Sequence, residues 1–107
     1  FVRIGPHAMT AMCSLLFADL PPYVMCQGQP AVARSMNYEG LRRRGFSAQR
    51  LSAVKAIHKL LYRSGHTLAQ SCAAIAELGQ QYPEAVVDVA QMVAFLQATS
   101  EQRGIVR

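Results

Sequence analysis

Asn37-Tyr38-Glu39-Gly40-Leu41-Arg42-Arg43-Arg44-Gly45-Phe46-Ser47 is the stretch at which the chain changes its architecture. Proline-rich sequence without a helical pattern lies before it, and apolar residues at helical spacing follow it. The stretch also holds an amide, a carboxylate and three guanidiniums, in a chain of 107 residues of which only 16% are charged. Groups of these kinds can bind a sugar hydroxyl and a phosphate together. We therefore expect this run to mark a structural border and a candidate binding site.

Residues 1–34, before this run, predict the last coil of a left-handed parallel β-helix. Four of the five prolines lie here and interrupt any helix. A fixed repeat is the sequence signature of a solenoid, and apolar or small residues recur every six positions, at Ile4, Thr10 and Leu16. We expect the chain to leave the solenoid over residues 19–31, because the adjacent Pro21 and Pro22 have no N–H with which to continue a ladder.

Residues 35–107 predict a small helical C-terminal domain. We expect a short helix over residues 38–44 that ends at Gly45, a residue type suited to the left-handed conformation after a helix. Ser47 is expected to cap the next helix, because its hydroxyl can accept a hydrogen bond from a free backbone N–H. Gly65 is a plausible end of that helix.

Two further helices are predicted downstream. Thr67 and Gln70 form a capping-box pattern, which starts a helix that runs to about Gln81. Pro83 suits the first position of a third helix, whose apolar residues are Val86, Val87, Ala90, Val93, Ala94 and Leu96. Such helices could cover the exposed strand edges at the end of a solenoid.

Composition limits the class of partner. The net charge of +5 and the pI near 9.6 favour anionic partners. The basic residues are scattered, except for Arg42, Arg43 and Arg44, and no nucleic-acid-binding motif is present, so we do not expect a nucleic-acid partner. No apolar run approaches the roughly 20 residues that a transmembrane helix needs.

The termini and the cysteines predict a cytoplasmic fragment without a metal site. The chain begins with Phe1 rather than Met, and its first residues read like the middle of a repeat, so we expect it to be part of a longer protein. Cys13, Cys26 and Cys72 lack the spacing of zinc ligands and are expected to be free thiols in a reducing compartment.

Several motifs follow one another along almost the whole chain: Ile4-Gly5-x-His7, Asp19-Leu20-Pro21-Pro22-Tyr23, Gly28-x-Pro30-Ala31, Asn37-x-Glu39-Gly40-Leu41-x-Arg43-Arg44-Gly45-Phe46-Ser47, Tyr62-Arg63-Ser64-Gly65, Tyr82-Pro83-Glu84 and Arg103-Gly104-x-x-Arg107. With these motifs the chain resembles the C-terminal part of the acyl-[acyl-carrier-protein]–UDP-N-acetylglucosamine O-acyltransferases. The run from Asn37 to Ser47 is the most specific of them. A related N-acyltransferase of the same pathway shares the solenoid but not this run.

The resemblance implies a homotrimer of left-handed β-helices, each followed by a helical domain. It implies transfer of a 3-hydroxyacyl chain from acyl carrier protein to the glucosamine 3-hydroxyl of UDP-N-acetylglucosamine. This reaction is the first step of lipid A biosynthesis in Gram-negative bacteria, and it needs no cofactor. The general base of the family is a histidine on an earlier coil, which these residues do not include. We therefore expect no turnover by the 107 residues alone.

By resemblance, Asn37, Glu39, Arg43 and Arg44 contact the UDP-sugar. Their chemistry agrees, because a carboxylate accepts from ribose hydroxyls and a guanidinium fork suits a diphosphate. The alternative to a UDP-sugar site is a solvated charged turn without a ligand. Arg42 is expected to be a surface residue of this kind.

By resemblance, Met12 matches the family position that limits the length of the acyl chain. A Met at this position should shorten the acyl chain that the enzyme accepts. The alternative is that Met12 fills a gap in the solenoid core. His7 does not match the general base, and His58 and His66 are expected to be structural or solvated. A second function stays open: the chain could be a non-catalytic capping or oligomerisation module of a truncated hexapeptide-repeat protein.

Overall fold

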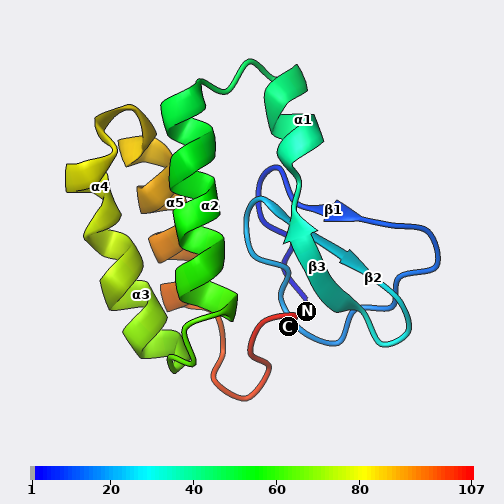
Figure 1. Cartoon of the computed structure of the whole chain (residues 1–107). Coiled ribbons are helices and arrows are strands. Elements are labelled where there is room, and N and C mark those ends of the chain that lie inside the picture. The colour runs from blue at the N-terminus through cyan, green and yellow to red at the C-terminus, as the bar shows by residue number, and fades with distance from the viewer. Residues whose placement is uncertain (1) are drawn as a thin grey trace.

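The computed structural model describes residues 2–107. Figure 1 shows a small sheet beside a group of helices, with α1 leading from one part to the other. The elements in chain order are β1 (Met9–Thr10), β2 (Val24–Gln27), β3 (Val32–Met36), α1 (Tyr38–Arg43), α2 (Ala48–Tyr62), α3 (Leu68–Ala76), α4 (Leu78–Gln81), the 3-10 helix η1 (Pro83–Ala85) and α5 (Val86–Ala98).

Parallel pairing in the first part gives one turn of a coil. Met9 of β1 pairs with Met25 of β2, and an isolated parallel bridge joins Ile4 to Leu20, so each partner lies sixteen positions later. The spacing of the observed pairs is therefore not a multiple of six. The prediction that pairing stops at Pro22 is wrong, because β2 follows it and still pairs with β1. A proline removes only its own N–H, and residues 24–27 keep theirs.

The strand order is β1-β2-β3, and β3 runs antiparallel to β2. The hairpin turn over residues 28–31 is held against the coil by Leu15, whose N–H donates to Gly28 O and whose carbonyl accepts from Ala31 N–H. β3 then runs through position 34, where the sequence places the end of the solenoid part, and delivers the chain directly to Asn37 and α1.

The predicted helix starts at Ser47 and Thr67 are confirmed. Ser47 caps α2 by accepting from Arg50 N–H, and Thr67 and Gln70 make both bonds of a capping box at α3. The helix expected to reach Gln81 is divided at Glu77 into α3 and α4, and Pro83 opens a 3-10 turn ahead of α5. None of the helices in residues 2–107 combines the length and apolar character needed to span a bilayer.

The buried face of α5 differs from its run of apolar residues. Val86 and Val87 are 51% and 69% exposed, whereas the carboxylate-bearing Asp88 is buried with Val89 and Met92. Tertiary packing thus buries the face of α5 that carries a carboxylate and leaves the two valines exposed. Such a buried carboxylate requires partners, because an isolated charge away from water is costly.

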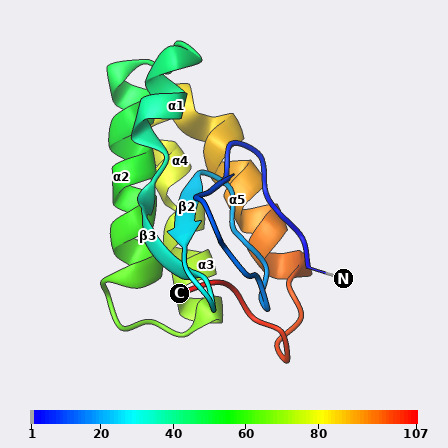
Figure 2. The ribbon, with the colours of Figure 1, turned by 90° about the vertical axis from the view of Figure 1, so that its right-hand side faces the viewer.

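One continuous core joins the coil to the helices. It contains Leu20 and Tyr23 of the coil together with Ile57 of α2 and Met92 of α5. The last residues, for which no element was predicted, complete the coil: Ile105 pairs in parallel with Asp19. Figure 2 shows this tail running from α5 back across the sheet part.

Candidate functional site

Asn37 immediately precedes α1, and its contacts tie the site to the coil. Its Oδ1 accepts from Gly40 N–H at 3.3 Å and caps the helix, while its Nδ2 donates to His7 O at 3.1 Å. Its backbone N–H donates to Tyr23 O at 2.7 Å. An amide side chain has two N–H donors and two acceptor lone pairs, so one of each remains for a ligand.

Gly40 is required by the close approach of Asn37. A Cβ added at Gly40 would lie 2.5 Å from Asn37 Nδ2 and 2.8 Å from its Oδ1. Carbon and polar atoms do not approach this closely, so any other residue would displace the amide from its cap. The Asn-x-Glu-Gly spacing thus has a physical reason in the first turn of α1.

Glu39 forms a charged cluster with two arginines on α1. Its carboxylate lies 3.2 Å from Arg43 Nε and 3.8 Å from an Arg42 Nη. The side chains of Glu39 and Arg43 are 68% and 78% exposed, and exposed pairs of this kind contribute little stability. A ligand can therefore replace either partner at small cost. Glu39 also lies in the first turn and Arg43 in the last, which suits the helix dipole.

Arg44 and Gly45 end α1. Arg44 is the exposed C-cap residue and forms no ion pair within residues 2–107. Gly45 follows with a φ of +82°, the left-handed conformation expected at this position. The structure thus places Glu39 and Arg43 on one short helix, with Asn37 as its N-cap and Arg44 as its C-cap.

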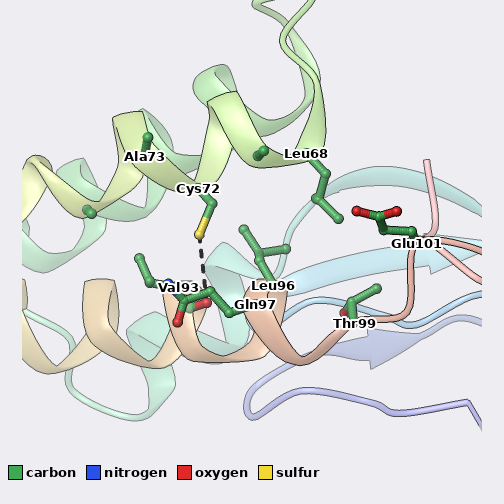
Figure 3. Close-up of a pocket in the computed structure, with 10 residues that line it drawn as sticks. Leu68, Cys72, Ala73, Val93, Leu96, Gln97, Thr99 and Glu101 are labelled. Carbon is green, nitrogen blue, oxygen red and sulfur yellow. Dashed lines mark hydrogen bonds between the residues drawn. The ribbon is translucent and has the colours of Figure 1, made fainter.

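A hollow of about 310 Å³ lies between α1 and α2, and it is lined by Tyr38, Arg42, Leu51, Ser52 and Lys55. A groove of about 470 Å³ lies between α3 and α5, and it is lined by Leu68, Ala69, Cys72, Ala73, Ala76, Val93, Leu96, Gln97, Thr99 and Glu101. Figure 3 shows its largely apolar walls, with the Cys72 thiol directed at Val93 O, 3.9 Å away. None of the α1 residues lines this groove.

Met12 lies in the turn after β1 and is 85% exposed. Within residues 2–107 its side chain is therefore not packed in the core. The role as a measure of acyl length stays a prediction.

Two of the histidines, His7 and His58, have structural surroundings. His7 has a φ of 59°, and its ring stacks on Tyr23 with centroids 5.7 Å apart. Burial, and then the charge of Arg63, lowers the pKa of His58, which favours the neutral ring. Residues 2–107 contain no group of three or more His, Cys, Asp or Glu side chains arranged to hold a metal ion.

Comparison with known proteins places these features in a family. The family model for domain 2 of UDP N-acetylglucosamine O-acyltransferase matches residues 19–106. The chain belongs to this family. The matched region contains the whole α1 cluster and its anchors Tyr23 and Asn37.

Two relatives with high sequence identity to this chain are named as acyltransferases. An acyl-[acyl-carrier-protein]–UDP-N-acetylglucosamine O-acyltransferase of Albidiferax ferrireducens is 63% identical over the whole chain, which covers 40% of that protein. The enzyme of the same name from Verminephrobacter eiseniae is 50% identical, again over the whole chain and 40% of its own length. The chain thus spans about 40% of the length of these curated relatives.

A solved structure gives the same result for the fold. The crystal structure of the Francisella novicida UDP-N-acetylglucosamine acyltransferase matches with a TM-score of 0.86 at 30% identity, covering all of this chain and 37% of that one. The sheet part and the helices of this chain therefore have the arrangement found within that family member.

A basic surface lies along α2 and adjoins α1, because its Lys55 also lines the hollow that Arg42 lines. Two adjoining hollows of about 580 and 290 Å³ share His58 and Arg63. Their cationic lining residues are Arg34, Lys55, Lys59, Arg63 and Arg107. No carboxylate side chain is among the described residues that line them, so this basic face of α2 suits an anionic partner.

Sequence reasoning missed the buried charges beside the site. Asp88 accepts two hydrogen bonds from Arg50 and one from the Tyr23 hydroxyl. Burial, with the neighbouring Asp88 charge, raises the pKa of Tyr23, so the phenol stays a neutral donor. The spacing of the sequence gives no signal for this pair, because Arg50 and Asp88 lie 38 positions apart.

Proposed function

We propose that this chain is the UDP-sugar-binding and trimer-forming C-terminal part of a longer acyltransferase. That enzyme moves a 3-hydroxyacyl chain from acyl carrier protein to the glucosamine 3-hydroxyl of UDP-N-acetylglucosamine, the first step of lipid A biosynthesis. Family membership supports the assignment, and so do the relatives, which are more than twice as long. We place the enzyme in the cytoplasm and assign no cofactor to it.

The observation that carries the proposal is that Glu39 and Arg43 lie on α1 and Asn37 is its N-cap. Glu39 can accept from the ribose hydroxyls and Asn37 keeps a free donor and a free acceptor, while the Arg43 guanidinium can bind the diphosphate. Arg44, at the end of the same helix, is the fourth contact in this proposal. A charge-assisted hydrogen bond contributes roughly 1.5–3 kcal/mol, so loss of one contact should be measurable.

The chemical step is assigned to the upstream part of the longer enzyme. We propose that this part is a left-handed β-helix that continues the coil of residues 2–36 and carries the general-base histidine. The parallel pairing of β1 with β2 supports this, since further coils can stack on the free edge of β1. The 107 residues alone are then inactive, because they hold the acceptor without the group that takes its proton.

The basic face of α2 is assigned to the acyl donor. Acyl carrier protein presents its acyl chain on a phosphate-containing arm, and Lys55, Lys59 and Arg63 can attract this anionic partner. Met12 is assigned to the far end of the acyl groove. Its exposure on the coil leaves the side chain free to meet an acyl chain.

The nucleotide assignment is tested by titrating UDP-N-acetylglucosamine into the full-length protein by calorimetry. Arg43→Ala should weaken binding about tenfold or more. Arg42→Ala is the matched control, since Arg42 also lies beside Glu39 but outside the proposed contacts, and it should change the dissociation constant less than threefold. Equal losses in both variants would mean that only the charge of α1 matters.

A second candidate, a capping or oligomerisation module, is favoured by exposed apolar side chains on the coil. Ile4, Met9 and Phe17 are 57%, 46% and 69% exposed, which suits contact with further protein. Molar mass should be measured first, because a site shared between subunits would be incomplete in a monomer. An assembled protein that gives Arg43 no protection upon addition of UDP-N-acetylglucosamine would favour this module.

A further inference from the structure

Asp88 is a buried carboxylate that links three parts of the chain. Its side chain is 3% exposed and lies in the first turn of α5. Its oxygens accept from Arg50 Nε at 2.8 Å and Arg50 Nη2 at 2.9 Å. One of them also lies 3.0 Å from the Tyr23 hydroxyl, which has Gln91 Oε1 as a second acceptor at 2.9 Å. Bidentate pairing of this kind fixes direction as well as distance. Asp88 therefore holds the start of α2 and the residue before β2 in one arrangement.

The first of these links leads to the start of α1. Tyr23 is fully buried and has a φ of 70°, which is uncommon for a residue with a side chain and must be held by its surroundings. Its hydroxyl contacts Asp88, and its carbonyl accepts the backbone N–H of Asn37 at 2.7 Å. The ring also stacks on His7, whose carbonyl accepts from Asn37 Nδ2. Both polar ends of Tyr23 are thus engaged, the hydroxyl by Asp88 and Gln91 of α5 and the carbonyl by Asn37.

The second link leads to the end of α1. The Arg50 guanidinium lies 3.6 Å from the centroid of the Phe46 ring, a cation–π contact. Phe46 N–H donates to Leu41 O at 3.1 Å, and its ring meets Tyr23 edge-on with centroids 6.3 Å apart. The carboxylate that anchors Tyr23 therefore also fixes the residue at which the chain leaves α1.

We propose that Asp88, Arg50 and Tyr23 are positioning residues for the nucleotide site, and that this one buried carboxylate fixes both ends of the segment 37–46. The inference rests on the proposed function, since it takes that segment to bind the UDP-sugar. A helix of six residues is too short to be stable by itself, so α1 owes its order to these anchors together with the burial of Leu41. An ordered segment loses less conformational entropy when it binds, and affinity rises accordingly.

A second buried carboxylate provides a matched control. Asp19 is fully buried and pairs with Arg103 at 3.1 Å, and Arg103 is 30% exposed against 32% for Arg50. Its other partners are Arg3 N–H and the Thr99 hydroxyl, so it fastens the C-terminal tail to the coil. Asp19 thus resembles Asp88 in burial and pairing but makes no contact with segment 37–46.

The experiment measures binding of UDP-N-acetylglucosamine to the full-length protein by calorimetry, below the melting temperature of every variant. Asp88→Asn removes the charge with little change in shape, and Tyr23→Phe removes only the hydroxyl. We expect the dissociation constant to rise about tenfold in the first variant and about threefold in the second. Asp19→Asn should stay within about twofold of the parent protein, although it also lowers thermal stability. The maximal rate at saturating nucleotide should fall less than about twofold in Asp88→Asn, while KM rises.

Hydrogen exchange of the ligand-free protein tests directly whether Asp88 orders the segment 37–46. Peptides covering 37–46 should exchange faster in Asp88→Asn, whereas Asp19→Asn should speed exchange in peptides covering 99–107. Parent-like affinity in both Asp88→Asn and Tyr23→Phe would overturn the inference, as would an equal loss in Asp19→Asn. A parent protein that fails to bind the nucleotide would instead overturn the proposed function, and the inference with it. Tyr23→Phe keeps the test decisive where Asp88→Asn does not fold.

Discussion

Gly40→Ala should destabilise the chain, although alanine is ordinarily the better helix former. The new methyl group would be placed 2.5 Å from Asn37 Nδ2 and 2.9 Å from its Cγ, so the amide has to move. Moving it breaks the cap to the backbone at Gly40 and the bond to His7 O. Gly79→Ala in α4 is the matched control, since the nearest atom to its added Cβ is a Val86 methyl at 4.0 Å.

The magnitudes follow from these contacts. Replacing glycine by alanine within a helix stabilises by about 0.5–1 kcal/mol, which is the whole effect expected at Gly79. At Gly40 the same gain is offset by loss of an N-cap, about 1 kcal/mol, and of a second hydrogen bond, about 1 kcal/mol. Gly40→Ala should therefore be about 1 kcal/mol less stable than the parent, and about 2 kcal/mol less stable than Gly79→Ala.

Urea unfolding of the two variants, followed by circular dichroism, measures the difference directly. The nucleotide affinity of the full-length protein provides a second reading, because a displaced Asn37 should weaken binding by Gly40→Ala and not by Gly79→Ala. The reasoning is refuted if Gly40→Ala stabilises as much as Gly79→Ala and binds the nucleotide as tightly as the parent. The amide of Asn37 would then not occupy the position that excludes a side chain at Gly40.

Three further predictions concern single side chains. Burial alone would raise the pKa of Asp19, but the Arg3 N–H, Arg103 and Thr99 bonds outweigh it and hold this pKa below its ordinary value. The carboxylate therefore stabilises the fold above its unfolded pKa, and this contribution is lost as the pH falls through the lower folded pKa. Asp19→Asn should lower the free energy of unfolding by about 3 kcal/mol at neutral pH. It should also make the free energy of unfolding fall less steeply as the solution becomes acidic. Met12→Gly in the full-length enzyme should shift acyl preference toward longer chains, measured by competition between donors. Lys55→Glu should raise KM for the acyl-carrier-protein substrate several-fold at low salt and leave nucleotide affinity unchanged.

Each of these has an outcome that contradicts it. An acid limb in Asp19→Asn as steep as that of the parent would assign acid unfolding to other groups. Unchanged donor preference in Met12→Gly would remove the acyl-measuring role. For Lys55→Glu, a difference in KM from the parent that does not narrow with added salt would argue against electrostatic attraction on the basic face of α2. Lys55→Arg should behave like the parent.

Local signals in the sequence located most of the helix starts. The structure confirms the caps predicted at Ser47 and at Thr67 with Gln70, and the left-handed conformation predicted for Gly45 after α1. These signals depend on hydrogen bonds and backbone conformations that involve only near neighbours in the chain. The prolines were less informative about strands. Pairing continues after Pro22 because the coil depends on residues sixteen positions apart, which a local rule about one missing N–H does not describe.

The partners of the candidate site could not be read from spacing. Up to 65 positions separate the members of the group Tyr23, Arg50 and Asp88. The face of α5 that is buried is also not the one that carries its exposed valines. The sequence alone determined which groups lie on α1, because Asn37, Glu39 and Arg43 are near enough in the chain to share one short helix. Only the tertiary structure decided what holds that helix in place. A six-residue helix has too few internal hydrogen bonds to order itself, so its anchors come from residues that folding brings together.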